Sequence, residues 1–311
     1  MKVLVAGASG ALGRPLLTRL RDAGHEVWGM AHRAESLGVI GGPGVHPVAG
    51  DALDRDGVRA LLARIGPDVV IDQLTSLPAS PADLPRRLPA DRTLRLVGGG
   101  NLFDAAQACG VRRYIQQSCG FYLDAGQGGQ AGLATEASPP RIDAPGHIGE
   151  SARMYAALER RVCGASSLQG TALRYGFFYG PGTWYWPDGA FSAGMRRGEC
   201  PLIGAGRGTF SFIHVHDAAT ATVAALTAPA GIYNVVDDQP TDIATWLPAY
   251  ARWVGAPAPA HLQAQSARDV AGEEAVYYQN SLDGAANRRA RDLLGLEPRR
   301  LAWMDGGVTA S

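Results

Sequence analysis

Lysine is almost absent from this sequence. Lys2 is the only lysine among 311 residues, and every other basic residue is an arginine. Any chemistry that needs a lysine side chain therefore depends on this one residue at the start of the chain.

Other features are also missing. The formal net charge is zero, so no basic footprint for nucleic acid or an anionic membrane is present. No apolar run approaches the length that spans a bilayer. The four cysteines lie far apart without a C-x-x-C pair, and no His/Cys/Asp cluster has metal-ligand spacing. We expect a cytoplasmic protein with reduced thiols, a small-molecule substrate and no metal, nucleic-acid or membrane partner.

The most informative stretch runs from Lys2 to Gly24. An apolar run stops at Gly7, glycines recur at Gly10 and Gly13, and a helical pattern follows. Glycines let the backbone turn sharply and let a pyrophosphate approach the N–H groups and positive dipole end of that helix. This arrangement predicts a dinucleotide-binding turn rather than a plain strand-to-helix connection. The cofactor contacts expected here are Gly7, Ser9, Gly10, Ala11, Leu12 and Gly13.

Strands and helices alternate along the rest of the first 175 residues, a pattern that predicts a parallel sheet with helices on both faces. We therefore expect an α/β fold, a doubly wound parallel-sheet Rossmann domain with a small C-terminal α/β substrate lobe. The dinucleotide-binding domain should comprise residues 1–175 plus 213–236, and the substrate lobe 176–212 plus 237–311. The expected strands after the first are Glu26–Met30, Val45–Ala49, Asp68–Ile71, Arg113–Gln117, Thr171–Arg174 and Ile232–Val236. The expected later helices are Asp54–Ile65, Leu94–Cys109, Ile148–Cys163, Ala218–Leu226, Ile243–Val254 and one near Asp283–Leu294, with a proline-broken loop before Leu94.

The end of the second strand indicates which coenzyme binds. It carries His32 and Arg33 and no carboxylate for the ribose hydroxyls of NAD. A guanidinium binds a 2′-phosphate well, so Arg33, helped by Arg14, favours NADP(H) over NAD(H). The alternative is that Arg33 is a solvated loop residue. After the third strand, Asp51 beside Ala52 is expected either to accept from the adenine amino group or to act as an N-cap or turn residue.

Several segments, in chain order, resemble the extended short-chain dehydrogenase/reductase family in its epimerase/dehydratase-like branch. The resemblance covers nearly the whole chain and is specific for the fold, but much less so for the reaction. The matching segments are Gly7-x-x-Gly10-x-x-Gly13, residues 50–53 (GDAL), 100–106 (GNLFDAA), 113–118 (RYIQQS), 173–182 (LRYGFFYGPG), 212–217 (FIHVHD), 231–235 (GIYNV) and 286–290 (ANRRA).

The resemblance implies a role for Ser118 at the end of strand five. In the family, a Ser or Thr there lies beside the nicotinamide and bonds the reacting oxygen; the alternative is a strand-end hydroxyl bonded to the backbone. The resemblance also implies that Tyr175, Gly176 and Phe178 line the nicotinamide side of the pocket.

The chain departs from the family at its acid/base pair, Tyr-x-x-x-Lys. Alignment puts Ser151 at the tyrosine position and Tyr155 at the lysine position, and Lys2 lies in strand one. Losing a positioned general acid costs about 10²–10⁴ in rate, so a redox enzyme needs a substitute. The candidates are Tyr155, which could also contact the nicotinamide ribose, together with Ser151, His147, Tyr122 and Glu150. Two alternatives remain. Tyr155 is simply packed on its helix, or Glu150 only complements the helix dipole.

Aromatic residues gather where nucleotide-sugar members of the family bind a diphosphate. Phe177 stands where those members carry Asn, and Phe210 lies near their usual Arg. The expected substrate pocket is Phe177, Trp184, Tyr185, Trp186 and Phe191. It predicts an apolar or aromatic small molecule rather than a sugar nucleotide. A lobe core or a homodimer surface is the alternative use of this cluster.

These observations predict an NADPH-dependent reductase that acts on a carbonyl or activated double bond. The glycine turn and Arg33 favour it. A non-redox isomerase, lyase or cyclase, with NADP structural or absent, is favoured by the lost acid/base pair. A catalytically inactive cofactor sensor is the third alternative.

Overall fold

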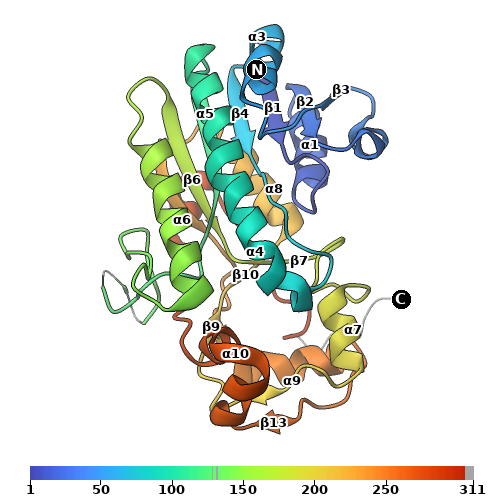
Figure 1. The fold of residues 1–311 in the computed structure, drawn as a ribbon, viewed down its shortest axis with the longest axis vertical. Helices are drawn as coiled ribbons and strands as arrows, with labels where there is room; N and C mark the ends of the chain where they lie inside the picture. The colour runs from blue at the N-terminus through green and yellow to red at the C-terminus, as the bar shows by residue number, and fades with distance from the viewer. Residues whose placement is uncertain (128, 131, 305–311) are drawn as a thin grey trace.

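A seven-stranded parallel sheet forms the centre of the molecule, in the order β11-β6-β5-β4-β1-β2-β3. The structure is a computed structural model that describes residues 1–127, 129–130 and 132–304. Figure 1 shows the sheet in the upper part of the molecule. Its strands are β1 (Lys2–Ala6), β2 (Glu26–Ala31), β3 (Val45–Ala49), β4 (Val69–Asp72), β5 (Arg113–Cys119), β6 (Gln169–Tyr175) and β11 (Gly231–Val235). The doubly wound α/β architecture expected from the sequence is confirmed.

Helices cover both faces of the sheet, because successive strand residues point to opposite sides. In β1, Val3 and Val5 join the core on one face, whereas Leu4 and Ala6 join the core on the other. The first core includes α1 (Gly13–Asp22), α8 (Val215–Ala224) and α11 (Arg288–Leu294). The second includes α3 (Arg55–Ile65), α5 (Gly99–Ala108) and the end of α6 (Gly146–Cys163).

Local signals explain where helix α1 ends and where helix α3 begins. Helix α1 buries Leu16 and Leu20 on the sheet and stops just before Gly24, whose φ is +78°. Helix α3 begins after Asp54, whose carboxylate accepts from the Gly57 N–H at 3.0 Å. Both helices lie where the sequence predicts them.

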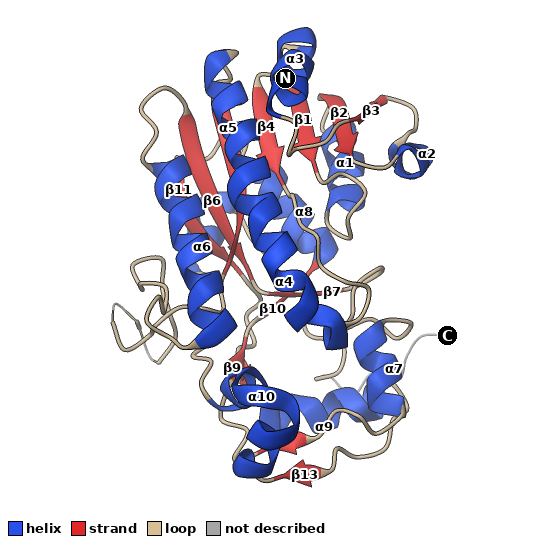
Figure 2. Cartoon of the chain, in the orientation of Figure 1, coloured by secondary structure: helices blue, strands red, loops and turns tan. Residues whose placement is uncertain are grey.

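A third core lies beyond the carboxyl edge of the sheet. It is built mainly from aromatic residues around α9 (Ile243–Trp253), including Trp246, Tyr250 and Trp303. Figures 1 and 2 show α7 (Ala190–Arg196), α9 and α10 (Ala264–Asn280) gathered below the sheet. The remaining strands are short: β7 (Phe177–Tyr179), β8 (Leu202–Ile203), β9 (Thr209–Phe210), β10 (Phe212–His214), β12 (Thr241–Asp242) and β13 (His261–Leu262). The lobe boundaries stay a prediction, and residues 305–311 of the expected second lobe lie outside the described residues.

The proline-rich segment before Leu94 differs from the sequence prediction. It forms a short 3₁₀ turn (η2, Pro81–Asp83) and then helix α4 (Leu84–Thr93) instead of a loop. Pro85 occupies the first helical turn, where its missing N–H costs nothing, and Pro89 lies inside the helix. A π-helical turn (η3, Leu94–Gly98) then leads into α5. Helix α4 forms despite Pro89 because buried Asp91 bonds its last turn to Thr75 and Ser76, after β4.

Other elements of the structure also differ from the sequence prediction. Helix α10 covers residues 264–280, where the sequence predicts no helix or strand, and α11 begins at Arg288 rather than near Asp283. Between β2 and β3 lie a 3₁₀ turn (η1, Ala34–Ser36) and a short helix α2 (Leu37–Ile40). Among the described residues, no helix is long and apolar enough to cross a membrane.

Candidate active site

The glycine turn between β1 and α1 is shaped by contacts that exclude larger residues. At Gly7 the φ is +81°, and a Cβ would lie 2.3 Å from the Gln73 carbonyl oxygen. A Cβ at Gly13 would lie 2.5 Å from the carbonyl oxygens of Ala8 and Gly7. A Cβ at Gly10 would lie 3.3 Å from the Gly7 carbonyl oxygen and near no other described atom. No described side chain caps the start of α1. The turn therefore brings bare backbone and an uncapped helix N-terminus to the carboxyl edge, as an anion site requires.

The ends of β2 and β3 bring His32, Arg33 and Asp51 to the same edge. Arg33 is exposed, and its side chain has no bonding partner in the part of the chain that the structure describes. Asp51 accepts from the Leu53 N–H at 2.9 Å and lies 3.8 Å from His32 Nε2. Asp51 is thus a turn residue, with one oxygen near His32; its adenine role stays a prediction.

Arg14 lies elsewhere. A Cβ on Gly182 would be 2.5 Å from its Nη2, so the Arg14 guanidinium lies against the loop after β7. Of the two arginines predicted to bind a 2′-phosphate, Arg33 is therefore the one at the end of β2.

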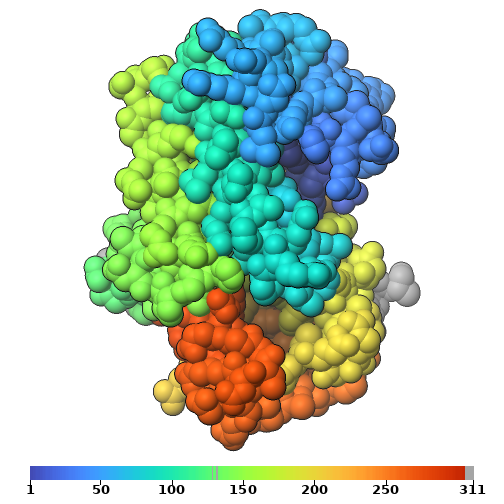
Figure 3. Space-filling view, viewed as in Figure 1, coloured from blue at the N-terminus to red at the C-terminus, as the bar shows by residue number. Residues whose placement is uncertain are grey.

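A cavity of about 890 Å³ opens beside the glycine turn. Its wall includes the ends of four strands, at Gly7, Gln73, Ser118 and Gly176. Helices α4, α6, α7, α9 and α10 and the loops beside them supply most of the remaining wall. Figure 3 shows a recess on one face, between the segments of α4, α7 and α10. The cavity has the size and position expected for a ligand site at the carboxyl edge of a parallel sheet.

Ser118 lines this cavity but is already engaged. Its hydroxyl donates to Glu159 Oε1 at 2.7 Å, and Arg174 binds both carboxylate oxygens of Glu159 at 2.7 Å. All three residues are buried. The partner is thus a carboxylate on α6 rather than the backbone that the alternative prediction assumed. The catalytic role of Ser118 stays a prediction.

Two hydroxyls on α6 are free. Ser151 and Tyr155 lie one helical turn apart and line the cavity, and neither hydroxyl has a bonding partner among the described residues. Burial raises the pKa of Tyr155 well above its usual range, although Arg95, 5.5 Å from the ring centroid, lowers it in part. Tyr155 is therefore a protonated donor at neutral pH, not a base.

Tyr122 is less available. Its hydroxyl shares a hydrogen bond with Tyr278 of α10. Burial is the main cause that raises its pKa well above the usual range. The Tyr122 phenol therefore stays neutral and already has a partner.

His147 and Glu150 form an ionic group with Arg92 of α4. Glu150 Oε2 lies 3.0 Å from His147 Nδ1 and 2.5 Å from Arg92 Nη2. The hydrogen bond from His147 and the charge of Arg92 hold the pKa of Glu150 below its usual range. Glu150 thus does more than complement the dipole of α6, because it links α6 to α4.

Aromatic rings form the lower wall. Phe177 stacks between Phe121 and Phe210, with centroids 4.2 and 4.6 Å away. Tyr185 and Phe191 pack at 4.7 Å, and the Trp184 indole donates to the Pro78 carbonyl at 3.1 Å. These residues line the cavity, and their role as a substrate pocket stays a prediction.

Trp186 does not belong to this wall. It packs against Trp253, 5.8 Å away, and His214, 6.0 Å away. Trp186 packs on the aromatic core and is absent from the residues that line the cavity, unlike its expected neighbours Trp184 and Tyr185.

Tyr175, Gly176 and Phe178, the residues predicted to lie beside the nicotinamide, all line the cavity. Tyr175 is bonded through its hydroxyl to Thr222 Oγ1 at 2.7 Å and to Gln73 Nε2 at 3.3 Å. Gln73 Oε1 is buried without a partner among the described residues. It is an unused acceptor at the end of β4, next to the glycine turn.

Sequence reasoning missed three polar lining residues on α4 and η3: Asp91, Arg92 and Arg95. The available signal was the i, i+4 spacing of Asp91 and Arg95, which is typical of an ion pair on a helix. The prolines concealed that helix. Tyr278 was missed because α10 was missed.

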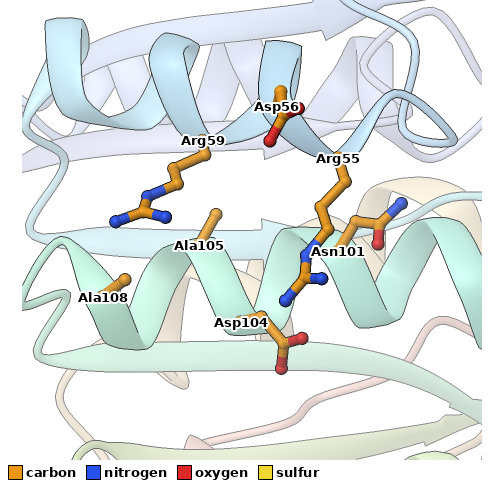
Figure 4. Close-up of a pocket in the computed structure, with 7 residues that line it drawn as sticks. All are labelled: Arg55, Asp56, Arg59, Asn101, Asp104, Ala105 and Ala108. Carbon is orange, nitrogen blue, oxygen red and sulfur yellow. The ribbon is translucent and has the colours of Figure 1, made fainter.

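A second hollow, of about 300 Å³, lies between α3 and α5 (Figure 4). The side chains of Arg55 and Arg59 extend from α3 toward α5, which carries Asp104. None of the predicted site residues lines it. Over residues 1–127, 129–130 and 132–304, no group of three His, Cys, Asp or Glu side chains is arranged to hold a metal ion.

Comparison with known proteins agrees with this geometry. The model of the NAD dependent epimerase/dehydratase family matches residues 3–236. A 3-diazoavenalumate denitrifying reductase from a Streptomyces species is 40% identical over 311 aligned residues, covering 98% of this chain and 99% of that protein. The structure of the Thermus thermophilus UDP-glucose 4-epimerase in complex with NAD has a TM-score of 0.74 at 24% identity, covering 97% of this chain and 96% of that one. Pal from Bacillus thuringiensis has a TM-score of 0.76 at 20% identity, covering 98% and 99%.

The fold and the glycine turn define an enzyme of the short-chain dehydrogenase/reductase type that uses a nicotinamide dinucleotide. Within that class, the chain belongs to the NAD dependent epimerase/dehydratase family.

Proposed function

We propose that this protein is an NADPH-dependent reductase of an aromatic small molecule. One observation carries the proposal: a single cavity joins the glycine turn to the aromatic wall around Phe177, and the free hydroxyls of Ser151 and Tyr155 lie on its side. An aromatic substrate in this cavity would lie beside the place that suits a dinucleotide.

The residues present fit the coenzyme. The uncapped start of α1 and the bare backbone of Gly10 suit its pyrophosphate, and the unpaired Arg33 suits a 2′-phosphate. When bound, a reduced nicotinamide supplies a hydride. The protein would then contribute orientation, exclusion of water and a proton donor.

The reductase relative suggests the group that is reduced. That relative is named for denitrifying reduction of 3-diazoavenalumate, and we propose that this chain likewise reduces a diazo group on an aromatic ring. A diazonium carbon that gains a hydride loses neutral N₂ and needs no proton. Such a reaction does not require the Tyr-x-x-x-Lys pair, which fits a chain whose only lysine bonds the Ile65 carbonyl from β1.

Reduction of a carbonyl or activated double bond is the alternative for the same cavity. The product then needs a proton, and Tyr155 is the protonated, unbonded phenol on the cavity wall. Ser151, one helical turn away, would donate a hydrogen bond to the same substrate oxygen. Tyr155→Phe should therefore reduce a carbonyl reaction by about tenfold or more, while reduction of a diazo group changes little.

The test offers the NADPH-loaded protein an aryl diazonium salt, ketones and enones. Loss of the reduced-nicotinamide absorbance above the protein-free rate, with product identified by mass spectrometry, supports a reductase. Tyr277→Phe is the matched control, because its buried hydroxyl has no partner in the described part of the chain and Tyr277 does not line the cavity. Turnover with unchanged absorbance would instead support a non-redox isomerase, lyase or cyclase, which the isolated Lys2 favours. NADPH binding without any turnover would support a sensor.

A further inference from the structure

We propose that Arg92 and Arg95 bind a carboxylate group of the substrate, so that the enzyme selects aromatic carboxylates. The inference rests on the proposed function to the extent that it takes the cavity as the substrate pocket. It adds a polar anchor to a pocket that is otherwise walled by rings.

Arg95 has a donor that the fold leaves unused. The residue is 2% exposed and lines the cavity. Its Nε donates to Asp91 Oδ2 at 2.7 Å, whereas Nη1 is buried and has no partner among the described residues. Asp91 cannot serve Nη1 as well, because its other oxygen accepts from Thr75 and Ser76. A buried donor of this kind is normally completed by a bound group or by water.

Arg92, on the preceding turn of α4, repeats the arrangement. Its Nη2 bonds Glu150 at 2.5 Å, and its Nη1 is also buried without a partner in the described chain. Arg92 lines the same cavity. Two guanidinium groups three residues apart on one helical segment thus each keep one carboxylate partner and leave Nη1 free.

The geometry favours an external anion over a purely structural use of both arginines. Asp91 and Glu150 hold the guanidinium groups in place through Nε or Nη2, which leaves fixed N–H groups for a ligand. Guanidinium N–H groups match the planar acceptors of a carboxylate. The segment that carries Arg95 is the π-helical turn η3, and such turns occur frequently at functional sites. The aromatic rings across the cavity then define the rest of the ligand as apolar.

The test measures binding, not turnover, so it remains informative if the proposed reaction is wrong. Cinnamate and its neutral analogue cinnamamide are titrated into the NADPH-loaded protein, followed by calorimetry. We expect cinnamate to bind about tenfold or more tightly, because hydrogen bonds between ionised groups are roughly twice as strong as neutral ones. Arg92→Gln and Arg95→Lys should each reduce this preference by about fivefold or more.

Arg86→Gln is the matched control, since Arg86 lies on the same helix, is exposed, pairs with Asp83 and does not line the cavity. It should leave the preference unchanged. Equal binding of acid and amide to the wild type would overturn the inference, as would a preference that survives in both cavity variants. If the variants weaken NADPH binding but keep the preference, the arginines serve the coenzyme and the inference is wrong. A preference for cinnamate without any reduction would leave the inference standing and refute only the proposed reaction.

Discussion

The proposed preference for NADPH rests on Arg33. It is exposed, lies just after β2 and has no bonding partner among the described residues. Charge-assisted bonds from a guanidinium to a phosphate contribute about 1.5–3 kcal/mol, or roughly tenfold to a hundredfold in affinity.

Arg33→Ala should therefore weaken NADPH binding by about tenfold or more and leave NADH binding nearly unchanged. Fluorescence titration of both coenzymes measures this. Arg59→Ala on α3 is the control, because Arg59 lies in the separate hollow of Figure 4. Equal losses for NADPH and NADH would contradict the NADP assignment.

Ser118 shows the limit of sequence reasoning about single residues. Its position at the end of strand five was predictable from the alternation of strands and helices and from the family resemblance. Its partner was not, because Glu159 lies 41 residues away and only the packing of α6 on the sheet brings the two together. The same limit applies to Arg14, whose guanidinium reaches Gly182 rather than the end of β2.

At the level of elements, helix α8 begins with an unusual cap. His214 precedes it, and its Nδ1 accepts from the His216 N–H at 3.1 Å. Burial, followed by the nearby Arg299, lowers the pKa of His214 from 6.5 to about 4. A protonated ring could not accept this bond, so the cap exists only in the neutral form.

This cap makes stability depend on pH. Between pH 6.5 and about 4 the unfolded chain binds a proton at His214 that the folded chain does not. Its contribution is therefore fully present above pH 6.5 and is lost as the pH falls toward 4. His214→Asn keeps a cap acceptor without titrating, so its free energy of unfolding relative to the wild type should rise by about 2–3 kcal/mol between pH 7 and 4.5.

Urea unfolding at both pH values measures this difference. The same change at the exposed His46 serves as the control. If the stability of the wild type and of His214→Asn fell in parallel on acidification, the cap would not be the titrating group.

Helix α4 is the element that the sequence pattern did not reveal. Four prolines between Pro78 and Pro89 indicated a loop, and local propensity offered no reason for a helix. The helix forms because Asp91 and Arg92 bond to the segment after β4 and to α6. Tertiary contacts of this kind cannot be read from neighbouring residues.

For the whole molecule, local sequence signals predicted most of the architecture. Apolar runs, helical spacing and glycine stops follow one another in the alternating order of a parallel sheet with helices on both faces, which is the observed architecture. The cavity was less predictable, since its walls come from segments as distant as Gly7 and Tyr278. The aromatic wall could be anticipated because most of its members lie within residues 177–191, whereas the arginines of α4 could not.

At the scale of the whole molecule, a shared fold does not imply a shared substrate. The chain shares its fold with UDP-glucose 4-epimerases, at a TM-score of 0.74 and 24% identity. Its cavity, however, places Phe177 between Phe121 and Phe210. Burying a diphosphate against stacked rings costs free energy because its hydrogen bonds to water are not replaced.

UDP-glucose and dTDP-glucose should therefore fail to stabilise this protein, even at millimolar concentration. NADPH at a hundred times its Kd should raise the free energy of unfolding by about 2.7 kcal/mol and the Tm accordingly. Differential scanning fluorimetry with each ligand measures the shift, and a UDP-glucose 4-epimerase under the same conditions shows that the sugar nucleotides are active ligands. A clear rise in Tm with either sugar nucleotide would mean that the aromatic wall admits a diphosphate, and the choice of an aromatic substrate would then be wrong.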